Sequence, residues 1–346
     1  MKCKLWLSGA LAVALTSLTA CAHFTPIDES AIREGGSGIE AETVYRVAFN
    51  QPESHPQYVA LTHLGERMKE ATGGACALEV FPNESLGPQA DTIELVQAGS
   101  VDFSMVAGSL MENFNPDFVV FNLPYVFDSK EHQRKVLDDP GITGDLFSSV
   151  EDKNITVVTG FHGGVRNVYN SVKPVETPAD LEGMKIRVIE SDTNIAMMKL
   201  MGGSGAPMGQ GEVYTAIQSG ILEGGENNES IYANLSHDEI APYYSYTQHL
   251  MFPDYLISNP KTLDRMEPEC REFLESDIRN TTEEEGELWV EEIERSHELA
   301  EEAGAEFNEV DIEAFREAVQ PLVDERLDNE VTRQLYADVR EAAEQG

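Results

Sequence analysis

The stretch that decides the fold begins with Gly183-Met184-Lys185-Ile186-Arg187-Val188. It continues as Ala206-Pro207-Met208-Gly209-Gln210-Gly211-Glu212-Val213-Tyr214-Thr215-Ala216-Ile217-Gln218-Ser219-Gly220 and as Glu223-Gly224-Gly225-Glu226-Asn227-Asn228. Residues 185–189 predict a strand that carries the guanidinium of Arg187 near its end. A guanidinium is a rigid fork of donors that matches a carboxylate in bidentate fashion, so the segment predicts a carboxylate site. An ordinary surface ion pair is the alternative for a single arginine.

The first 21 residues have the pattern of a secretory signal peptide. Two lysines precede an apolar run over residues 5–15, which is too short for the roughly 20 residues that a membrane-spanning helix needs. The last four residues, Leu18-Thr19-Ala20-Cys21, look like a bacterial lipobox, which would make Cys21 the lipidated first residue of the mature protein. A plain signal peptide cut nearby is the alternative. Residues 22–42 then predict a flexible tether.

The chain is strongly acidic. Its 62 Asp and Glu residues against 24 Lys and Arg residues give a net charge of −38. Such a surface repels nucleic acid and anionic lipid, so neither is expected as a partner. Salt screens the self-repulsion, which favours a protein kept soluble in a salty exterior and so a salt-adapted source. Because an anionic ligand must approach against this field, positive groups have to dominate at its site.

Cysteine and histidine usage shows neither a disulfide framework nor a metal site. Cys3 leaves with the signal peptide and Cys21 is used if it is lipidated, which leaves Cys76 and Cys270. An exported pair can form a disulfide, but two buried free thiols fit this spacing equally well. No group of His and Cys residues has metal-ligand spacing, and we expect no metal and no cofactor.

Alternating strand and helix patterns indicate an α/β fold. The order strand, helix, strand, helix, strand at the start predicts a parallel sheet with ligands at the carboxyl ends of its strands. A second α/β unit follows, and a long strand over residues 246–259 is expected to return to the first. From Glu267 onward the pattern is helical, with acidic runs that predict solvated helix faces. The predicted strands are 43–49, 76–81, 101–106, 155–160, 163–170 and 185–189, and the predicted helices 58–72, 91–98, 192–201 and 211–219.

Taken together, the motifs from Gly163 to Asn228 resemble the solute-binding proteins of TRAP (tripartite ATP-independent periplasmic) transporters, the DctP family, and in particular its hexuronate-binding members. The resemblance covers nearly all of residues 43–340. It implies a two-domain periplasmic-binding-protein-like fold, with a sheet flanked by helices in each domain, a cleft between them and long C-terminal helices. The implied domains are residues 43–163 plus 253–292, and residues 164–252 plus 293–346.

The resemblance also implies ligand contacts. Arg187 corresponds to the arginine that binds the substrate carboxylate in this family, and Arg166 to a second arginine near the carboxylate or the far hydroxyls. A structural salt bridge is the alternative for Arg166. Asn227 matches an asparagine that contacts ligand in relatives. Asn228 departs from the usual proline and adds another polar group.

The remaining candidates are polar side chains near the expected cleft. Gln210 stands where several relatives that bind acyclic or apolar-faced ligands have an aromatic residue, which favours a ligand that presents hydroxyls. The alternative for Gln210 is that it caps the following helix. The alternative for His55, which precedes Pro56, is a structural role. The other candidates are Gln51, Glu53, His55, Gln89 and Glu190.

These features predict a solute receptor, not an enzyme. We expect a hexuronate, D-glucuronate or D-galacturonate, to bind between two closing domains with its carboxylate on Arg187. The resemblance implies that the membrane subunits of a TRAP transporter are the partners. One alternative is a receptor for a C4-dicarboxylate or another sugar acid, with Arg166 taking a second carboxylate. A second alternative, from a different class, is an exported acid/base enzyme that uses Glu53 and His55.

Overall fold

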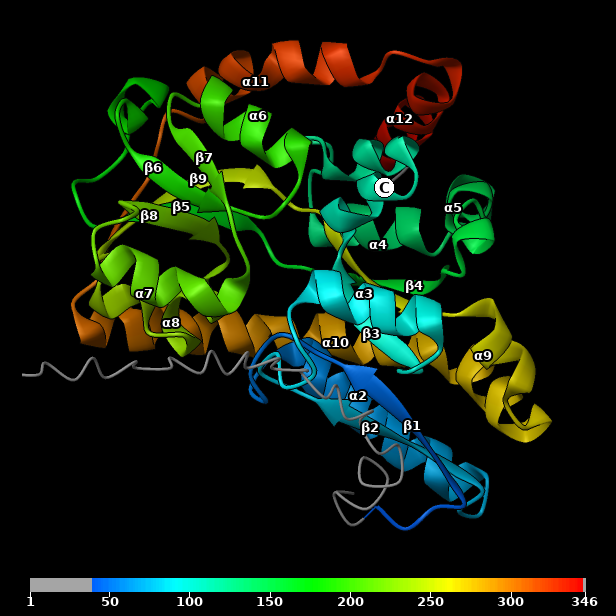
Figure 1. Cartoon of the computed structure of the whole chain (residues 1–346). Helices are drawn as coiled ribbons and strands as arrows, with labels where there is room; N and C mark the ends of the chain where they lie inside the picture. Colours follow the sequence, from blue (N-terminus) through cyan, green and yellow to red (C-terminus); the bar gives the residue numbers. More distant parts are fainter. Residues whose placement is uncertain (1–38, 345–346) are drawn as a thin grey trace, which may run out of the picture. The chain divides into compact units, whose positions relative to one another are not determined.

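The computed structural model of the protein describes residues 39–344. The predicted signal peptide, the lipobox-like end at Cys21 and residues 22–38 of the predicted tether lie outside this range. The described residues form two sheets with helices packed on them (Figure 1), which confirms the predicted α/β class. Within residues 39–344, no helix is both long enough and apolar enough to cross a membrane.

The first sheet consists of five strands, in spatial order β2 (Cys76–Phe81), β1 (Thr43–Ala48), β3 (Phe103–Ala107), β10 (Pro253–Ser258) and β4 (Thr156–His162). β1 runs parallel to β2 and β3, whereas β10 is antiparallel to β3 and β4. The prediction of a parallel sheet is therefore wrong at β10. This strand arrives directly from the second sheet, without the crossover connection that a parallel neighbour requires.

Helices cover the first sheet because each buries one apolar stripe. In α2 (Pro56–Ala71), Leu61, Leu64 and Met68 lie three or four residues apart and are completely buried. Pro56 occupies the first turn, where its missing N–H costs nothing, and the ring of His55 accepts a hydrogen bond from the backbone N–H of Gln57. The other helices near this sheet are α3 (Gln89–Ala98), α4 (Lys130–Leu137), α5 (Pro140–Ser148) and α9 (Pro260–Arg265).

The second sheet consists of six strands, in spatial order β11 (Glu306–Asn308), β9 (Tyr243–Leu250), β5 (Arg166–Asn170), β8 (Gly224–Asn227), β6 (Lys185–Val188) and β7 (Ser204–Pro207). The predicted long strand over residues 246–259 is wrong, because it is two strands, β9 and β10, in two different sheets. Gln248 adopts a left-handed conformation with φ 44° shortly before the break. Both strands are largely buried, and each is rich in aromatic and aliphatic residues, so their patterns together predict one strand. The helices near this sheet are α6 (Asp192–Leu200), α7 (Val213–Gln218), α8 (Glu229–Asn234) and α11 (Ile312–Arg326).

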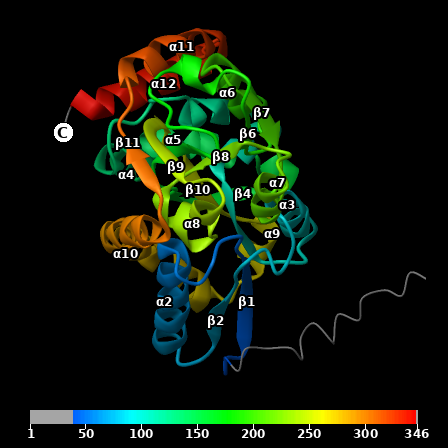
Figure 2. The same ribbon diagram turned by 90° about the vertical axis from the view of Figure 1, so that its left-hand side faces the viewer.

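The long helix α10 (Pro268–Ala303) connects the surroundings of both sheets. It packs on α2 and β4 of the first sheet region and on α8 of the second (Figures 1 and 2). The long C-terminal helices implied by the resemblance are thus confirmed, and the last of them, α12 (Glu330–Glu344), returns to pack on α4 and α5. Cys76 and Cys270, whose pairing the sequence left open, form a disulfide that ties β2 to the first turn of α10.

The acidic run at residues 283–287 is not wholly a solvated face. Glu283 and Glu287 are exposed, but Glu285 is buried and only 1% exposed. Its carboxylate accepts hydrogen bonds from the indole N–H of Trp289 and, at 3.4 Å, from the backbone N–H of His162. Burial raises the pKa of Glu285 to about 8. The prediction was wrong here because a glutamate that is protonated near neutral pH can pack inside the protein.

Candidate functional site

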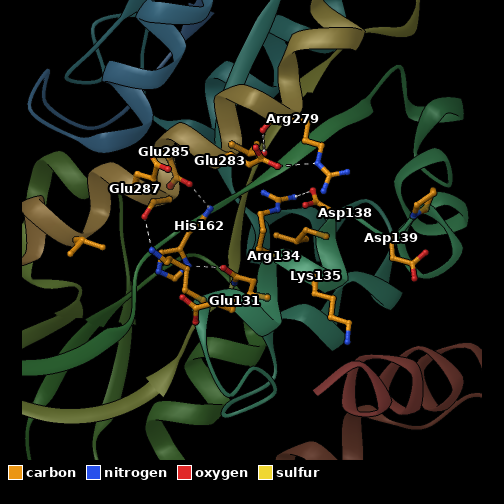
Figure 3. Close-up of a pocket in the computed structure, with 17 residues that line it drawn as sticks. Glu131, Arg134, Lys135, Asp138, Asp139, His162, Arg279, Glu283, Glu285 and Glu287 are labelled. Carbon is orange, nitrogen blue, oxygen red and sulfur yellow. Dashed lines mark hydrogen bonds and ion pairs between the residues drawn. The ribbon is translucent and has the colours of Figure 1, made fainter. Parts of the chain in front are cut away.

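A wide groove between α4 and α10 is rich in charged residues, but these already have partners (Figure 3). Arg134 Nη2 lies 2.6 Å from Asp138 Oδ1, and Arg279 Nε lies 3.1 Å from Glu283 Oε1. The ammonium group of Lys130 donates to the carbonyl oxygen of Gly286 at 2.5 Å. Most cationic groups of the groove thus have acceptors within the protein, although Nε of Arg134 is buried and makes no hydrogen bond to a described residue.

A second, narrow cavity of about 40 Å³ lies where strands of both sheets end. In the second sheet, the carboxyl ends of β6 and β8 meet the start of β5, because Asn167 pairs with Asn227 and Arg187 with Gly225. Ligand sites of α/β folds occupy this edge. All the predicted site residues line the cavity except Glu53, which is exposed and lies outside it: Gln51, His55, Gln89, Arg166, Arg187, Glu190, Gln210, Asn227 and Asn228.

Arg187 is a buried cation without a carboxylate partner among the described residues. It is 5% exposed, and it donates from Nε and Nη2 to the carbonyl oxygen of Met208, at 3.0 and 2.8 Å, and from Nη1 to Oε1 of Gln210 at 3.2 Å. A guanidinium has five N–H groups, so one remains on each terminal nitrogen, the arrangement that grips a carboxylate. Burial, followed by the like charge of Arg166, lowers the pKa of Arg187.

Arg166 is also 5% exposed, but unlike Arg187 it has a carboxylate partner, Glu226, which neutralises its charge. Its Nε and Nη2 lie 2.5 and 2.8 Å from the two carboxylate oxygens of Glu226, and its Nη1 donates to Oδ1 of Asn227 at 2.9 Å. Burial alone would raise the pKa of Glu226, but the charge of Arg166 and hydrogen bonds lower it to about 2. The alternative of a structural salt bridge therefore describes the contacts of Arg166, although the residue also borders the cavity.

Gln210 and Asn227 extend the donor side of the cavity. Oε1 of Gln210 accepts from Arg187 and, at 3.3 Å, from Nδ2 of Asn227. Its amide nitrogen is buried and makes no hydrogen bond within the described residues. Gln210 begins a 3₁₀ turn and makes no capping hydrogen bond, so its side chain serves the cavity and not the following helix. A buried amide N–H without an acceptor is costly, which favours a ligand oxygen at this place.

The other predicted residues have partly structural contacts. Asn228 caps α8 by accepting from the N–H of Ile231 at 2.9 Å. Gln89 accepts from the N–H of Ala107 at 3.3 Å, and Glu190 is exposed at the rim. Oε1 of Gln51 is buried without a hydrogen-bond partner in the described part of the chain.

His55 is neutral at pH 7. Burial, together with the charge of His162, lowers the pKa of His55 to about 3, and the ring packs edge-on against Trp289 at 5.1 Å. It is 2% exposed, whereas Glu53 is exposed. The two residues therefore lie in different surroundings and do not form the acid/base pair that an enzyme would need.

Two carboxylates of the cavity were missed by the sequence reasoning. Glu84, in the loop after β2, accepts from the backbone N–H of Gly211 at 3.2 Å and so joins the two sheet regions. Burial raises the pKa of Glu84, while the hydrogen bond and the charge of Arg187 lower it. Asp254 is the second residue of β10 and borders the cavity from the first sheet. An acidic residue inside an otherwise apolar strand was the available signal for Asp254.

The chain is similar to solved structures and to catalogued proteins. A TRAP periplasmic solute-binding protein from Anaerococcus prevotii with bound α/β-D-glucuronate is 38% identical with a TM-score of 0.85, over 88% of this chain and 99% of that one. Another from Sulfitobacter sp. NAS-14.1, with bound β-D-galacturonate, is 35% identical with a TM-score of 0.81, over 86% and 100%.

Two further relatives are known by sequence. The uncharacterized protein YiiZ of Salmonella typhimurium is 39% identical over 82% of this chain and 86% of its own length. The 2,3-diketo-L-gulonate-binding periplasmic protein YiaO of Escherichia coli is 28% identical over 89% and 91%. The model of the bacterial extracellular solute-binding proteins, family 7, matches residues 47–329, and the chain belongs to this family.

Proposed function

We propose that the protein is the periplasmic solute receptor of a TRAP transporter and that it binds a hexuronate, D-glucuronate or D-galacturonate, with the carboxylate on Arg187. The observation that carries the proposal is the buried guanidinium of Arg187, which has two free N–H groups and no carboxylate partner among the described residues. A buried charge is tolerated when a counter-charge arrives, so this site favours an anion. Related receptors hold D-glucuronate and D-galacturonate.

The distribution of donors and acceptors supports a ligand with hydroxyl groups. The second sheet supplies free donors through Arg187 and the amide nitrogen of Gln210. The first sheet region supplies acceptors through Gln51 and Asp254. A sugar acid satisfies both sides, since its carboxylate accepts and its hydroxyls donate. A C4-dicarboxylate would need a second cation, and Arg166 is already neutralised by Glu226.

A binding screen tests this function. We expect D-glucuronate or D-galacturonate to raise the melting temperature and to give a titration signal, because a ligand at 100 times its Kd stabilises the native state by about 2.7 kcal/mol. Aldonates, C4-dicarboxylates, sialate, ectoine and neutral D-glucose serve as comparison ligands. Arg187→Gln, which removes the cation, should abolish the shift. Binding of succinate or malate without hexuronate binding would contradict the ligand, and chemical turnover of the hexuronate would contradict the receptor role.

The two sheets are the basis of two domains that close on the ligand. We infer a first domain near residues 43–163 plus 253–292 and a second near residues 164–252 plus 293–329, and we assign α12 to the first domain because it packs on α4 and α5. The hydrogen bond from Gly211 to Glu84 would form on closure. Small-angle scattering should show a smaller radius of gyration at saturating hexuronate, and an unchanged radius would contradict closure.

The membrane subunits of the transporter are the expected partners of the closed receptor. We also propose that Cys21 carries a lipid that tethers the protein to the membrane, on the basis of the lipobox-like sequence. Cys21→Ser should move the protein from the membrane fraction to the soluble periplasmic fraction. An unchanged distribution would favour a plain signal peptide.

A further inference from the structure

Asp254 is a cavity carboxylate that the carboxylate-binding role of Arg187 does not explain. It comes from the first sheet, whereas Arg187 comes from the second, and both line the same cavity. Its Oδ2 accepts a hydrogen bond from Nε2 of Gln57 at 2.8 Å, while its Oδ1 makes no hydrogen bond to any described residue. One oxygen is thus fixed and the other is available to a ligand.

The surroundings hold this carboxylate in place. Gln57 is completely buried, and its Nε2 donates to the carbonyl oxygen of His162 at 2.9 Å as well as to Asp254. Both N–H bonds of the amide are therefore used, which fixes the direction of the donor. A Cβ at position 163 would lie 2.8 Å from the carbonyl oxygen of Phe252 and 3.4 Å from Oδ2 of Asp254, so Gly163 leaves the room that this arrangement requires.

Asp254 has no ion-pair partner among the described residues. The neighbouring cation, Arg166, is bonded to both oxygens of Glu226. Burial raises the pKa of Asp254 to about 6, although the hydrogen bond from Gln57 and the charge of Arg166 act in the opposite direction. At neutral pH the group is therefore mostly an anion, which accepts hydrogen bonds and repels a second anion. Because the cavity also holds Arg187, which favours an acidic ligand, the carboxylate of Asp254 requires that this ligand turn its hydroxyl groups toward Asp254.

We propose that Asp254 accepts hydrogen bonds from ring hydroxyls of the ligand and rejects a second carboxylate, so that the receptor selects hexuronates over the corresponding hexarates. The inference rests on the proposed function and adds the residue that sets its specificity. Arg187 favours ligands that have a carboxylate, and Asp254 disfavours ligands that have a second one.

The test is the ratio of the dissociation constants for D-glucarate and D-glucuronate, measured by calorimetric titration at pH 8. For the wild-type protein we expect D-glucarate to bind at least about 100-fold more weakly, since juxtaposed like charges cost several kcal/mol. Asp254→Asn keeps the shape and an oxygen for Gln57 but removes the charge. It should weaken D-glucuronate binding about 10- to 100-fold, the value of a hydrogen bond to a charged group. The ratio of the two constants should fall at least about tenfold.

A matched control is Asp102→Asn. Asp102 lies before β3, at the opposite end of the first sheet from the cavity, and its carboxylate accepts from the N–H of Arg46 at 2.8 Å. This variant also removes a partly buried carboxylate, but it should leave the ratio of the two dissociation constants unchanged. An equal fall in both variants would overturn the proposal.

Titration of the wild-type protein from pH 8 to pH 5 gives a second test, which the wild type alone can fail and for which the variant serves as a control. Protonation of Asp254 should shift the ratio toward D-glucarate, and Asp254→Asn should lack this shift. The charged and titratable groups that interact with Asp254 are Arg166, Glu285 and Tyr255. A ratio that is the same at both pH values would overturn the proposal. If the wild type binds both acids equally, the sugar-acid receptor stands and the role of Asp254 falls; if it binds neither, both fall.

Discussion

Arg166 and Arg187 provide a matched pair of buried arginines with opposite electrostatics. Both are 5% exposed, but Arg166 is paired with Glu226 while Arg187 has no carboxylate partner among the described residues. Arg187→Gln and Arg166→Gln remove the same group at the same depth. If Arg187 serves the ligand and Arg166 serves the fold, the two substitutions must affect binding and stability in different proportions.

The expected loss of binding follows from the free donors of Arg187. Two N–H groups are available to the ligand carboxylate, and each hydrogen bond to a charged partner is worth about 1.5–3 kcal/mol. Their sum, about 3–6 kcal/mol, corresponds to a rise in Kd of roughly 10²- to 10⁴-fold. Calorimetric titration with D-glucuronate at pH 7 measures this rise, with Arg187→Lys as an intermediate case because it keeps the charge without the fork.

The expected change in stability separates the two arginines. Breaking the buried pair by Arg166→Gln leaves Glu226 without its main counter-charge and should cost about 3–5 kcal/mol. Arg187→Gln loses hydrogen bonds to Met208 and Gln210 but also removes an uncompensated buried charge. We therefore expect the ligand-free protein to lose no more than about 1 kcal/mol, the value of an ordinary substitution.

Denaturant unfolding of the ligand-free variants measures both values. The double variant Arg166→Gln with Glu226→Gln should recover much of the stability lost by Arg166→Gln alone, since it removes both charges of the pair. The reasoning is refuted if Arg187→Gln destabilises the ligand-free protein as much as Arg166→Gln and still binds D-glucuronate normally.

Three further predictions concern stability. Replacing Cys76 and Cys270 by serine should lower the free energy of unfolding by about 2–5 kcal/mol, because the disulfide closes a long loop in the unfolded chain, and denaturation of the double variant tests this. Glu285→Gln should stabilise the protein increasingly as the pH rises from about 5 to 8, by up to about 1.4 kcal/mol per pH unit. The raised pKa of Glu285 means that the stability it contributes is present below its unfolded value and lost as the pH rises through about 8, so equal unfolding curves at pH 5 and 8 for both proteins would contradict this account. Gly164→Ala should lower the melting temperature, because φ is +78° and the new Cβ would lie 2.6 Å from Nδ2 of Asn228; an unchanged melting temperature would show that the turn relaxes at little cost.

The parts of the fold that local pattern controls were predictable. The strand at residues 76–81 was predicted from its residue pattern, and the structure confirms it. The helix that ends before Gly99 was predicted from this glycine, which adopts the left-handed conformation that ends the helix. The break between β9 and β10 was missed because both strands are rich in strand-forming residues, although Pro253 marks where the second strand begins. The burial of Glu285 depends on Trp289 and His162 as hydrogen-bond donors, which pattern alone does not reveal.

The candidate site divides in the same way. Arg187 was found because a strand end and a motif coincide at that residue. Gln210 was found because several relatives have an aromatic residue at its position. The role of Glu226 as the partner of Arg166 depends on pairing between β5 and β8, which lie far apart in sequence. Asp254 reaches the cavity only because β10 enters the first sheet from the second, a topology that the predicted long strand obscured.

A crystal structure of the mature protein with bound D-glucuronate tests the central claim most directly. The account predicts that the ligand carboxylate lies within hydrogen-bond distance of the terminal nitrogens of Arg187 and of Nε2 of Gln210, with ring hydroxyls facing the first sheet. A carboxylate bound away from Arg187, with neutral groups of the sugar against the guanidinium, would contradict it.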